Sequence, residues 1–152
     1  QEDGVQPDAI SYSAVITACE NAGQYRRAQR FFSLAASRGF FRSTWAGFPN
    51  HIDLCGLTVP VARTAVRTGL AVILRQLRDP RFNKVRMRRS LVIFTGTSVL
   101  RSAISDMIHT TYHGQLNCTC DSVNPGLLKI RSSALKRWVS ASDSSSSSSS
   151  VY

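Results

Sequence analysis

Residues 51–78 read HIDLCGLTVPVARTAVRTGLAVILRQLR, and this stretch decides the fold. Its first residues predict a short β-strand in which Ile52 and Leu54 share one face. A turn follows, Thr58 is placed to cap a helix, and Pro60 lies in the first helical turn. Apolar residues then recur every three or four positions to the end of the stretch, which predicts one long amphipathic helix. A strand followed at once by such a helix indicates the α/β class.

The arginines of this helix predict a binding surface. At about 100° per residue, they spread over roughly 120° of the side opposite the apolar stripe and form one basic ridge. The next segment, residues 78–89, reads RDPRFNKVRMRR and predicts a basic loop. Guanidinium groups suit phosphate recognition. The predicted nucleic-acid contacts of ridge and loop are Arg63, Arg67, Arg75, Arg78, Arg81, Lys84, Arg86, Arg88 and Arg89.

The rest of residues 45–139 alternates between strand-like and helix-like patterns. The element order β-α-β-α-β-β predicts a two-layer α/β sandwich. Turn signals separate the elements, the strongest being Asn124-Pro125-Gly126. Further strands are expected over residues 91–94, 115–119 and 127–130, and further helices over 99–108 and 134–139.

Two other regions flank this domain. Residues 1–44 predict a helical hairpin, with one helix starting near Asp8 and stopping at Gly23, and a second from about Gln24 to Ser37. Its apolar faces are too broad to bury alone, so we expect the hairpin to stack on like units. Residues 140–152 form a serine-rich tail, which we expect to be disordered on its own.

Composition limits the classes of function. The chain carries a net charge of +10, almost entirely from 16 arginines beside three lysines. Such a charge favours RNA, DNA or an acidic protein surface as the partner. Hydrophobic residues make up 43% of the chain, which excludes wholesale disorder. The sequence predicts no transmembrane segment, because every apolar run is far shorter than the ~20 residues that a spanning helix needs.

Metal and cofactor chemistry is not predicted. The four cysteines match neither a zinc pattern nor a disulfide framework. Cys118 and Cys120 are two apart in a strand-like run and should point to the same face. The acidic residues are scattered, so no paired carboxylates suggest a metal-dependent nuclease.

Residues 4–39, GVQPDAISYSAVITACENAGQYRRAQRFFSLAASRG, resemble one pentatricopeptide repeat (PPR). Arrays of such repeats read single-stranded RNA, one base per repeat. The resemblance implies that Ser13 and, approximately, Ser43 read bases, and that further repeats lie upstream of Gln1. It rests on Pro7-Asp8, Tyr12, Ile16, Ala22-Gly23, Ala28, Phe32 and Gly39 at the separations expected of the family.

Residues 47–139 resemble the small MutS-related (SMR) domain. HIDLCGLTVPVARTAVRTGL is similar to the first motif of that family, LVIFTGTS to its second, and NPGLLKI to its closing segment. Family members bind nucleic acid, and several nick RNA or DNA. The resemblance places that chemistry at Asp53, at the position of Cys55 and around Thr95-Gly96. A repeat followed by this domain resembles the PPR–SMR proteins of plant and algal chloroplasts and mitochondria.

Departures from the SMR motifs argue against nuclease activity. Cys55 occupies the family's histidine position, and a neutral thiol cannot replace imidazole as a general acid or base. Ser98 replaces the second glycine of a phosphate-binding loop that also looks short. His51 lies on the strand face of Asp53, but nothing in the sequence brings His109 or His113 near it. We therefore expect Asp53 to brace the following turn.

Three hypotheses remain from different classes. The first is a non-catalytic module that binds single-stranded or structured RNA of an organelle. The second is an accessory subunit docked on acidic protein surfaces of a large organellar assembly, such as a ribosome or a photosynthetic complex. The third, least favoured by the motifs, is an RNA or DNA endonuclease. By resemblance the protein is organellar, in the chloroplast before the mitochondrion, and is soluble or peripheral to a membrane.

Overall fold

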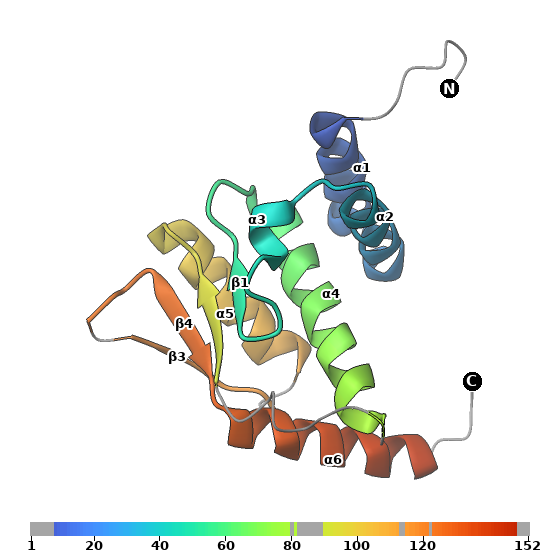
Figure 1. Ribbon diagram of the computed structural model, residues 1–152, viewed down its shortest axis with the longest axis vertical. Helices are drawn as coiled ribbons and strands as arrows, with labels where there is room; N and C mark the ends of the chain where they lie inside the picture. Colours follow the sequence, from blue (N-terminus) through green and yellow to red (C-terminus); the bar gives the residue numbers. More distant parts are fainter. Residues whose placement is uncertain (1–7, 80, 82–89, 113–114, 122, 149–152) are drawn as a thin grey trace.

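The computed structural model describes residues 8–79, 81, 90–112, 115–121 and 123–148. Within these residues the chain forms six helices and four strands (Figure 1). In chain order they are α1 (Ala9–Asn21), α2 (Tyr25–Ser37), α3 (Arg42–Trp45), β1 (His51–Asp53), α4 (Val59–Arg78), β2 (Leu91–Phe94), α5 (Ser98–Thr111), β3 (Cys118–Cys120), β4 (Leu127–Ile130) and α6 (Ser132–Ser148).

The described strands form one mixed sheet in the order β1-β2-β4-β3. β1 and β2 are parallel and are joined through α4, whereas β4 lies antiparallel between β2 and β3. Ile52 pairs with Ile93, and Ile93 pairs with Leu128, so one apolar row crosses three strands. The α/β class predicted from the sequence is confirmed. The strand expected over residues 115–119 lies instead at Cys118–Cys120, where the chain pairs with β4.

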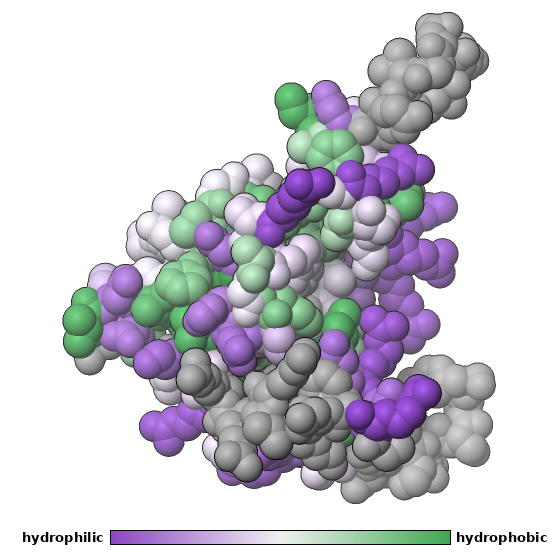
Figure 2. Space-filling view, in the orientation of Figure 1, coloured by the Kyte–Doolittle hydropathy of each residue, from purple (hydrophilic) through white to green (hydrophobic). Residues whose placement is uncertain are grey.

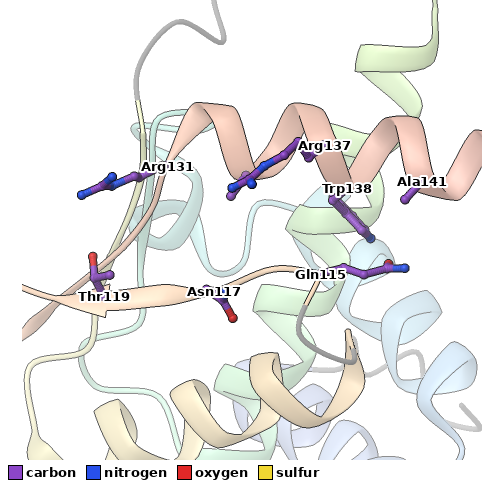
Figure 3. Close-up of a pocket in the computed structure, with 8 residues that line it drawn as sticks. Gln115, Asn117, Thr119, Arg131, Arg137, Trp138 and Ala141 are labelled. Atoms are coloured by element: carbon purple, nitrogen blue, oxygen red, sulfur yellow. The ribbon is translucent and has the colours of Figure 1, made fainter.

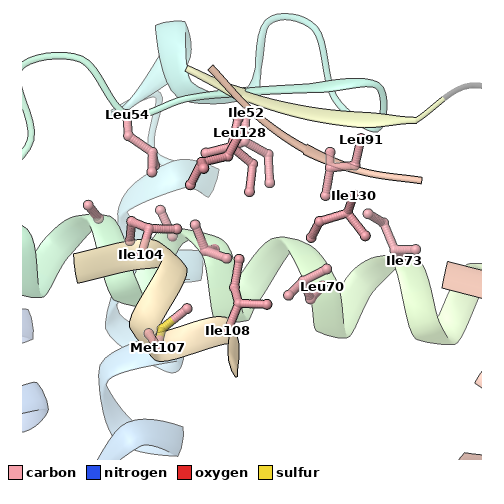
Figure 4. Packing of buried hydrophobic residues seen from close by; sticks show 14 of the residues in the cluster. Ile52, Leu54, Leu70, Ile73, Leu91, Ile104, Met107, Ile108, Leu128 and Ile130 are labelled. Atoms are coloured by element: carbon pink, nitrogen blue, oxygen red, sulfur yellow. The ribbon is translucent and has the colours of Figure 1, made fainter. Parts of the chain in front are cut away.

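Helices α4 and α5 cover one face of the sheet (Figure 4). Ile52 and Ile93 of the sheet are fully buried, as are Leu70 of α4 and Ile104 of α5. The apolar stripe predicted for residues 59–77 supplies the α4 side of this core. Residues on the other face of the strands, such as Lys129, are exposed or half-buried, because no helix of the described chain covers that face.

The hairpin of α1 and α2 packs against a second side of α4 (Figure 1). Phe32 of α2 lies edge-on to Trp45, with ring centroids 5.6 Å apart. A Cβ on Gly69 of α4 would lie 2.8 Å from the Cδ1 of Ile52 and 3.2 Å from the Trp45 ring, so a side chain there would displace both neighbours. The apolar face of the hairpin, predicted to stack on like units, is therefore covered by α4.

One short helix was not predicted. α3 follows directly on Phe41, a non-glycine residue in the left-handed region, with φ 59°. The Phe41 ring stacks on Phe32 with centroids 4.8 Å apart and an interplanar angle of 11°. This contact offsets the strain of a left-handed backbone, which the local sequence gives no reason to expect.

The C-terminal helix is longer than expected. The sequence predicts a helix over residues 134–139 and a disordered tail from residue 140, whereas α6 continues to Ser148. Leu135 is fully buried and Val139 nearly so, which anchors the first turns of α6 on the core. A helix formed over these turns propagates at less cost than it nucleates, so serines of modest propensity can extend it.

Tyr112, at the end of α5, gives a testable link between pH and stability. Its ring lies edge-on to Trp138 at 5.4 Å, and burial raises the pKa of Tyr112 to about 12, although the charge of Arg67 opposes the shift. The folded state therefore keeps a proton that the unfolded state releases near pH 10. We expect the free energy of unfolding to fall between about pH 10 and 12, by roughly 2–3 kcal/mol.

Chemical denaturation across this pH range, in wild type and in Tyr112→Phe, checks the expectation. Phenylalanine has no proton to lose, so the variant should lack this part of the decline. Since every other titrating group is the same in both proteins, the difference between the two curves isolates Tyr112. Two parallel curves would contradict the assignment.

Candidate nucleic-acid interface

The loops that follow β1 and β2 meet at one edge of the sheet, because parallel neighbours end on the same side. Leu54 N donates to Phe94 O at 2.8 Å, and Thr95 N donates to Gly126 O at 2.8 Å. The turn at 124–126 therefore closes the same edge. The fold thus brings together the segments that carry the four predicted positions Asp53, Cys55, Thr95 and Gly96.

Asp53 and Thr95 have structural partners. Asp53 Oδ1 accepts a hydrogen bond from Cys55 N at 2.9 Å, which confirms the expected role of Asp53 in bracing the turn. Thr95 is fully buried, and its Oγ1 donates to Gly126 O at 2.9 Å. The Thr95 hydroxyl is therefore engaged inside the loop.

Cys55 and Gly96 lie against each other. Gly96 has φ +76°, and a Cβ there would stand 2.9 Å from Cys55 Sγ. The pKa of the Cys55 thiol is raised, chiefly by its hydrogen bond to Asp53 and then by burial and the Asp53 charge. These effects favour the protonated thiol over the thiolate at neutral pH.

The side chain of Thr97, the residue before α5, caps the start of that helix. Thr97 Oγ1 accepts a hydrogen bond from Leu100 N at 3.2 Å, and α5 begins at the next residue, Ser98. Three residues, 95–97, therefore connect β2 to α5. This agrees with the short loop inferred from the sequence.

No histidine of the described chain joins Asp53 as an acid–base partner. His51 shares the open face of β1 with Asp53, and its ring lies 5.6 Å from Phe94. His109 lies in the last turn of α5. With a rise of about 1.5 Å per residue, it is roughly 16 Å along the helix axis from the start of α5, which follows the loop where Gly96 lies against Cys55. His113 is outside the described residues.

Arg67 corrects the predicted ridge on α4. Its side chain is 9% exposed and forms an ion pair with Glu20 of α1, whose side chain is 3% exposed. The Arg67 guanidinium carbon also lies 3.9 Å from the centre of the Tyr25 ring, and Thr64 Oγ1 lies 3.1 Å from Glu20 Oε1. The hairpin covers this side of α4. The prediction that Arg67 contacts nucleic acid from an open ridge is therefore wrong.

The other predicted arginines differ in accessibility. Arg63 is half-buried, and its Nε is enclosed without a partner among the described residues. Arg75 and Arg78 are exposed at the end of α4. Arg81 Nε lies 3.2 Å from Asp79 Oδ1, and hydrogen bonds from Arg81 lower the pKa of that carboxyl. Four predicted contacts, Lys84, Arg86, Arg88 and Arg89, lie outside the described residues.

A basic surface that the sequence analysis missed lies on α2. Arg26, Arg27 and Arg30 are exposed and line a depression of about 460 Å³ with Tyr25 and the turn before it. Hydrophilic side chains gather along the edge of the molecule formed by α2 and the end of α4 (Figure 2). Residues 25–30, YRRAQR, could have predicted this basic surface, because Arg26 and Arg30 are one helical turn apart.

Ser13 is not part of this basic surface. It is half-buried on α1 and follows Tyr12, whose Oη accepts a hydrogen bond from Arg38 Nη1 at 2.5 Å. Arg38 caps the end of α2, whereas Arg26 lies at its beginning. The base-reading position predicted at Ser13 and the α2 arginines therefore lie toward opposite ends of the hairpin.

A second groove lies between β3 and α6 (Figure 3). Its volume is about 440 Å³. Residues 115, 117 and 119 contribute one wall from β3 and the segment before it, and α6 with Arg131 contributes the other. The lining residues are Gln115, Asn117, Thr119, Arg131, Ala134, Arg137, Trp138 and Ala141.

Comparisons with known proteins return no relative. No protein family, no curated protein and no solved structure matches the chain. Among the residues that the structure describes, no three histidine, cysteine, aspartate or glutamate side chains converge as metal ligands would, and the four cysteines are free. Within the same residues, no helix combines the length and the apolarity needed to cross a bilayer.

Proposed function

We propose that this protein binds RNA through exposed arginines and does not cut it. The observation that carries the proposal is the group of Arg26, Arg27 and Arg30 around the depression at the start of α2. Arg27 Nη1 donates to the neutral Gln24 Oε1 at 3.2 Å, and no carboxylate among the described side chains pairs with the three guanidinium groups. Three unneutralised forks on one helix suit a chain of phosphates.

The acidic side chains support this interpretation because most have partners within the protein. Glu20 is paired with Arg67, and Asp79 with Arg81. Asp121 Oδ2 lies 3.4 Å from Lys129 Nζ. Asp8 caps α1, and Asp53 braces its turn. The arginines of α2 therefore present a surplus of positive charge outward, within the chain's net +10.

A non-catalytic role fits the loops after β1 and β2. Cys55 is held protonated, Thr95 is buried, and the start of α5 is closed by Thr97. RNA cleavage needs a positioned base or a metal-bound water, and no cluster of metal-ligating side chains is found among the described residues. The proposal takes organellar RNA as the partner, because residues 4–39 resemble a pentatricopeptide repeat and residues 47–139 resemble an SMR domain.

A second candidate function is an accessory subunit in a larger assembly. The outer face of α1 favours it, because that face is uncharged and exposes apolar side chains. Ile10 is 78% exposed, Val15 is 39% exposed, and Ala14 and Ala18 are exposed beside them. An exposed apolar helix face of this kind is suited to contact with another helix.

Titration of labelled single-stranded RNA with the purified protein at increasing salt tests the proposal. We expect the logarithm of affinity to fall linearly with the logarithm of salt concentration, by about 0.7 for each phosphate neutralised. Binding that is absent at low salt, or unaffected by salt, would contradict it and leave the accessory-subunit candidate. In parallel, wild type and Asp53→Ala are incubated with structured RNA. Scission by wild type that vanishes in the variant would overturn the non-catalytic part.

A further inference from the structure

The groove between β3 and α6 combines three kinds of surface. Arg131 and Arg137 are exposed at its rim. Gln115, Asn117 and Thr119 line the opposite wall with two amides and a hydroxyl. Ala134 and Trp138, both nearly buried, form an apolar floor with Ala141 beside them. Its volume of about 440 Å³ lies within the ~300–1,000 Å³ range of small-molecule sites.

These surfaces are arranged along the groove from one end to the other. Figure 3 shows the side chains of Arg131 and Arg137 directed toward the end at which Thr119 lies, while Trp138 and Gln115 lie at the other end. Gln115 and Asn117 precede β3 in the chain, and together with Thr119 of β3 they line one wall of the groove. The groove therefore has a cationic end and an aromatic, amide-lined end.

Neither arginine is neutralised within the described structure. The described ion pairs use Glu20, Asp79 and Asp121, and none of them involves Arg131 or Arg137. Trp138 is held in place from the protein side, because its ring packs edge-on to Tyr112 at 5.4 Å with an interplanar angle of 80°. The positive charge of the two arginines is thus available to an anion above the Trp138 ring.

We infer that this groove binds one unpaired nucleotide of an RNA strand. A nucleotide has the same polarity as the groove: an anionic phosphate at one end and a flat base with hydrogen-bonding edges at the other. Arg131 and Arg137 take the phosphate, and the base lies on the Trp138 and Ala134 floor with its edge toward Gln115. The inference rests on the proposed function and adds a place where base identity is read.

Nucleoside monophosphates, the matching nucleosides and inorganic phosphate are the probes, with binding followed by calorimetry and by the fluorescence of the two tryptophans, Trp45 and Trp138. We expect every monophosphate to bind more tightly than its nucleoside. Arg137→Gln should weaken monophosphate binding by about tenfold, the size of one charge-assisted hydrogen bond. Lys136→Gln is the matched control, since it removes the same charge from the neighbouring exposed residue of α6, which does not line the groove.

Gln115→Leu tests whether the groove reads the base. We expect it to change the order of preference among the four monophosphates while leaving the affinity for inorganic phosphate unchanged. A groove that prefers inorganic phosphate to all nucleotides, or equal effects of Arg137→Gln and Lys136→Gln, would overturn the inference. Circular dichroism and thermal melting of each variant confirm that the fold is retained.

The outcomes separate this inference from the proposed function. If RNA affinity falls steeply with salt but is the same in Arg137→Gln and Gln115→Leu as in wild type, the groove inference fails and the proposed function stands. If the protein binds monophosphates in the groove but no RNA strand, the proposed function fails and the groove is a nucleotide site alone. Both stand only if oligonucleotide binding responds to the α2 arginines and to Arg137.

Discussion

Replacing Glu20 with alanine should lower the free energy of unfolding by about 3–5 kcal/mol, because it leaves the buried Arg67 charge without a partner. The loss is large for a domain whose total stability is typically about 5–15 kcal/mol. The Tyr25 ring, 3.9 Å from the Arg67 guanidinium carbon, cannot substitute for a carboxylate. Urea denaturation followed by far-ultraviolet circular dichroism and by tryptophan fluorescence measures the change.

Two further variants identify the cause. The double change Glu20→Leu/Arg67→Met removes both charges and fills the space with apolar atoms, so it should recover most of the lost stability. Asp79→Ala breaks the exposed pair with Arg81 and should change stability little, since water screens that pair. A Glu20→Ala protein as stable as wild type would contradict the assignment of this pair as an interface between the hairpin and α4.

The same experiment decides whether the hairpin and the α/β part unfold together. Glu20 belongs to α1 and Arg67 to α4, and the buried apolar residues of both parts form one contiguous cluster. Trp45 lies close to Phe32 of the hairpin, whereas Trp138 lies against Tyr112 of the α/β part. One transition seen by both tryptophans is therefore expected. Two separate transitions would show that the parts are independent.

Sequence periodicity predicted the elements because most of their apolar residues face one shared core. Residues 59–77 carry a helical stripe, and α4 follows it from Val59 to Arg78. The same pattern wrongly predicted that Arg67 is exposed. Helical spacing identifies the side of the helix opposite the apolar stripe, but it does not show what covers that side. Only the packing of the hairpin on α4, a contact between residues 47 positions apart, buries Arg67.

The candidate site was predictable to a similar extent. Asp53, Cys55 and Gly96 meet because parallel strands end at one edge, which follows from the β-α-β order. The closure of that edge by the 124–126 turn did not follow, since it depends on the position of β4 beside β2. Likewise, helical spacing in YRRAQR places Arg26 and Arg30 one turn apart on α2, but it does not show which side of α2 the rest of the protein covers.

Removal of the charges on Arg26 and Arg30 should weaken RNA binding more than an equal loss of charge at Lys129 and Lys136. Both side chains are exposed, and they are one turn apart on α2, about 6 Å along the helix axis. For Arg26→Gln/Arg30→Gln we expect affinity at low salt to fall by roughly tenfold to a hundredfold. The slope of log affinity against log salt should shrink by about 1.4, or 0.7 for each lost phosphate contact.

The matched control is Lys129→Gln/Lys136→Gln, which lowers the net charge equally from the sheet and from α6. If binding depended only on total charge, both double variants would lose the same affinity and the same slope. If the α2 depression holds phosphates, only Arg26→Gln/Arg30→Gln reduces the slope of log affinity against log salt. The difference in affinity between this variant and wild type then disappears as the salt concentration rises. Because a global loss of folding would persist at high salt, that convergence separates a lost contact from a damaged protein.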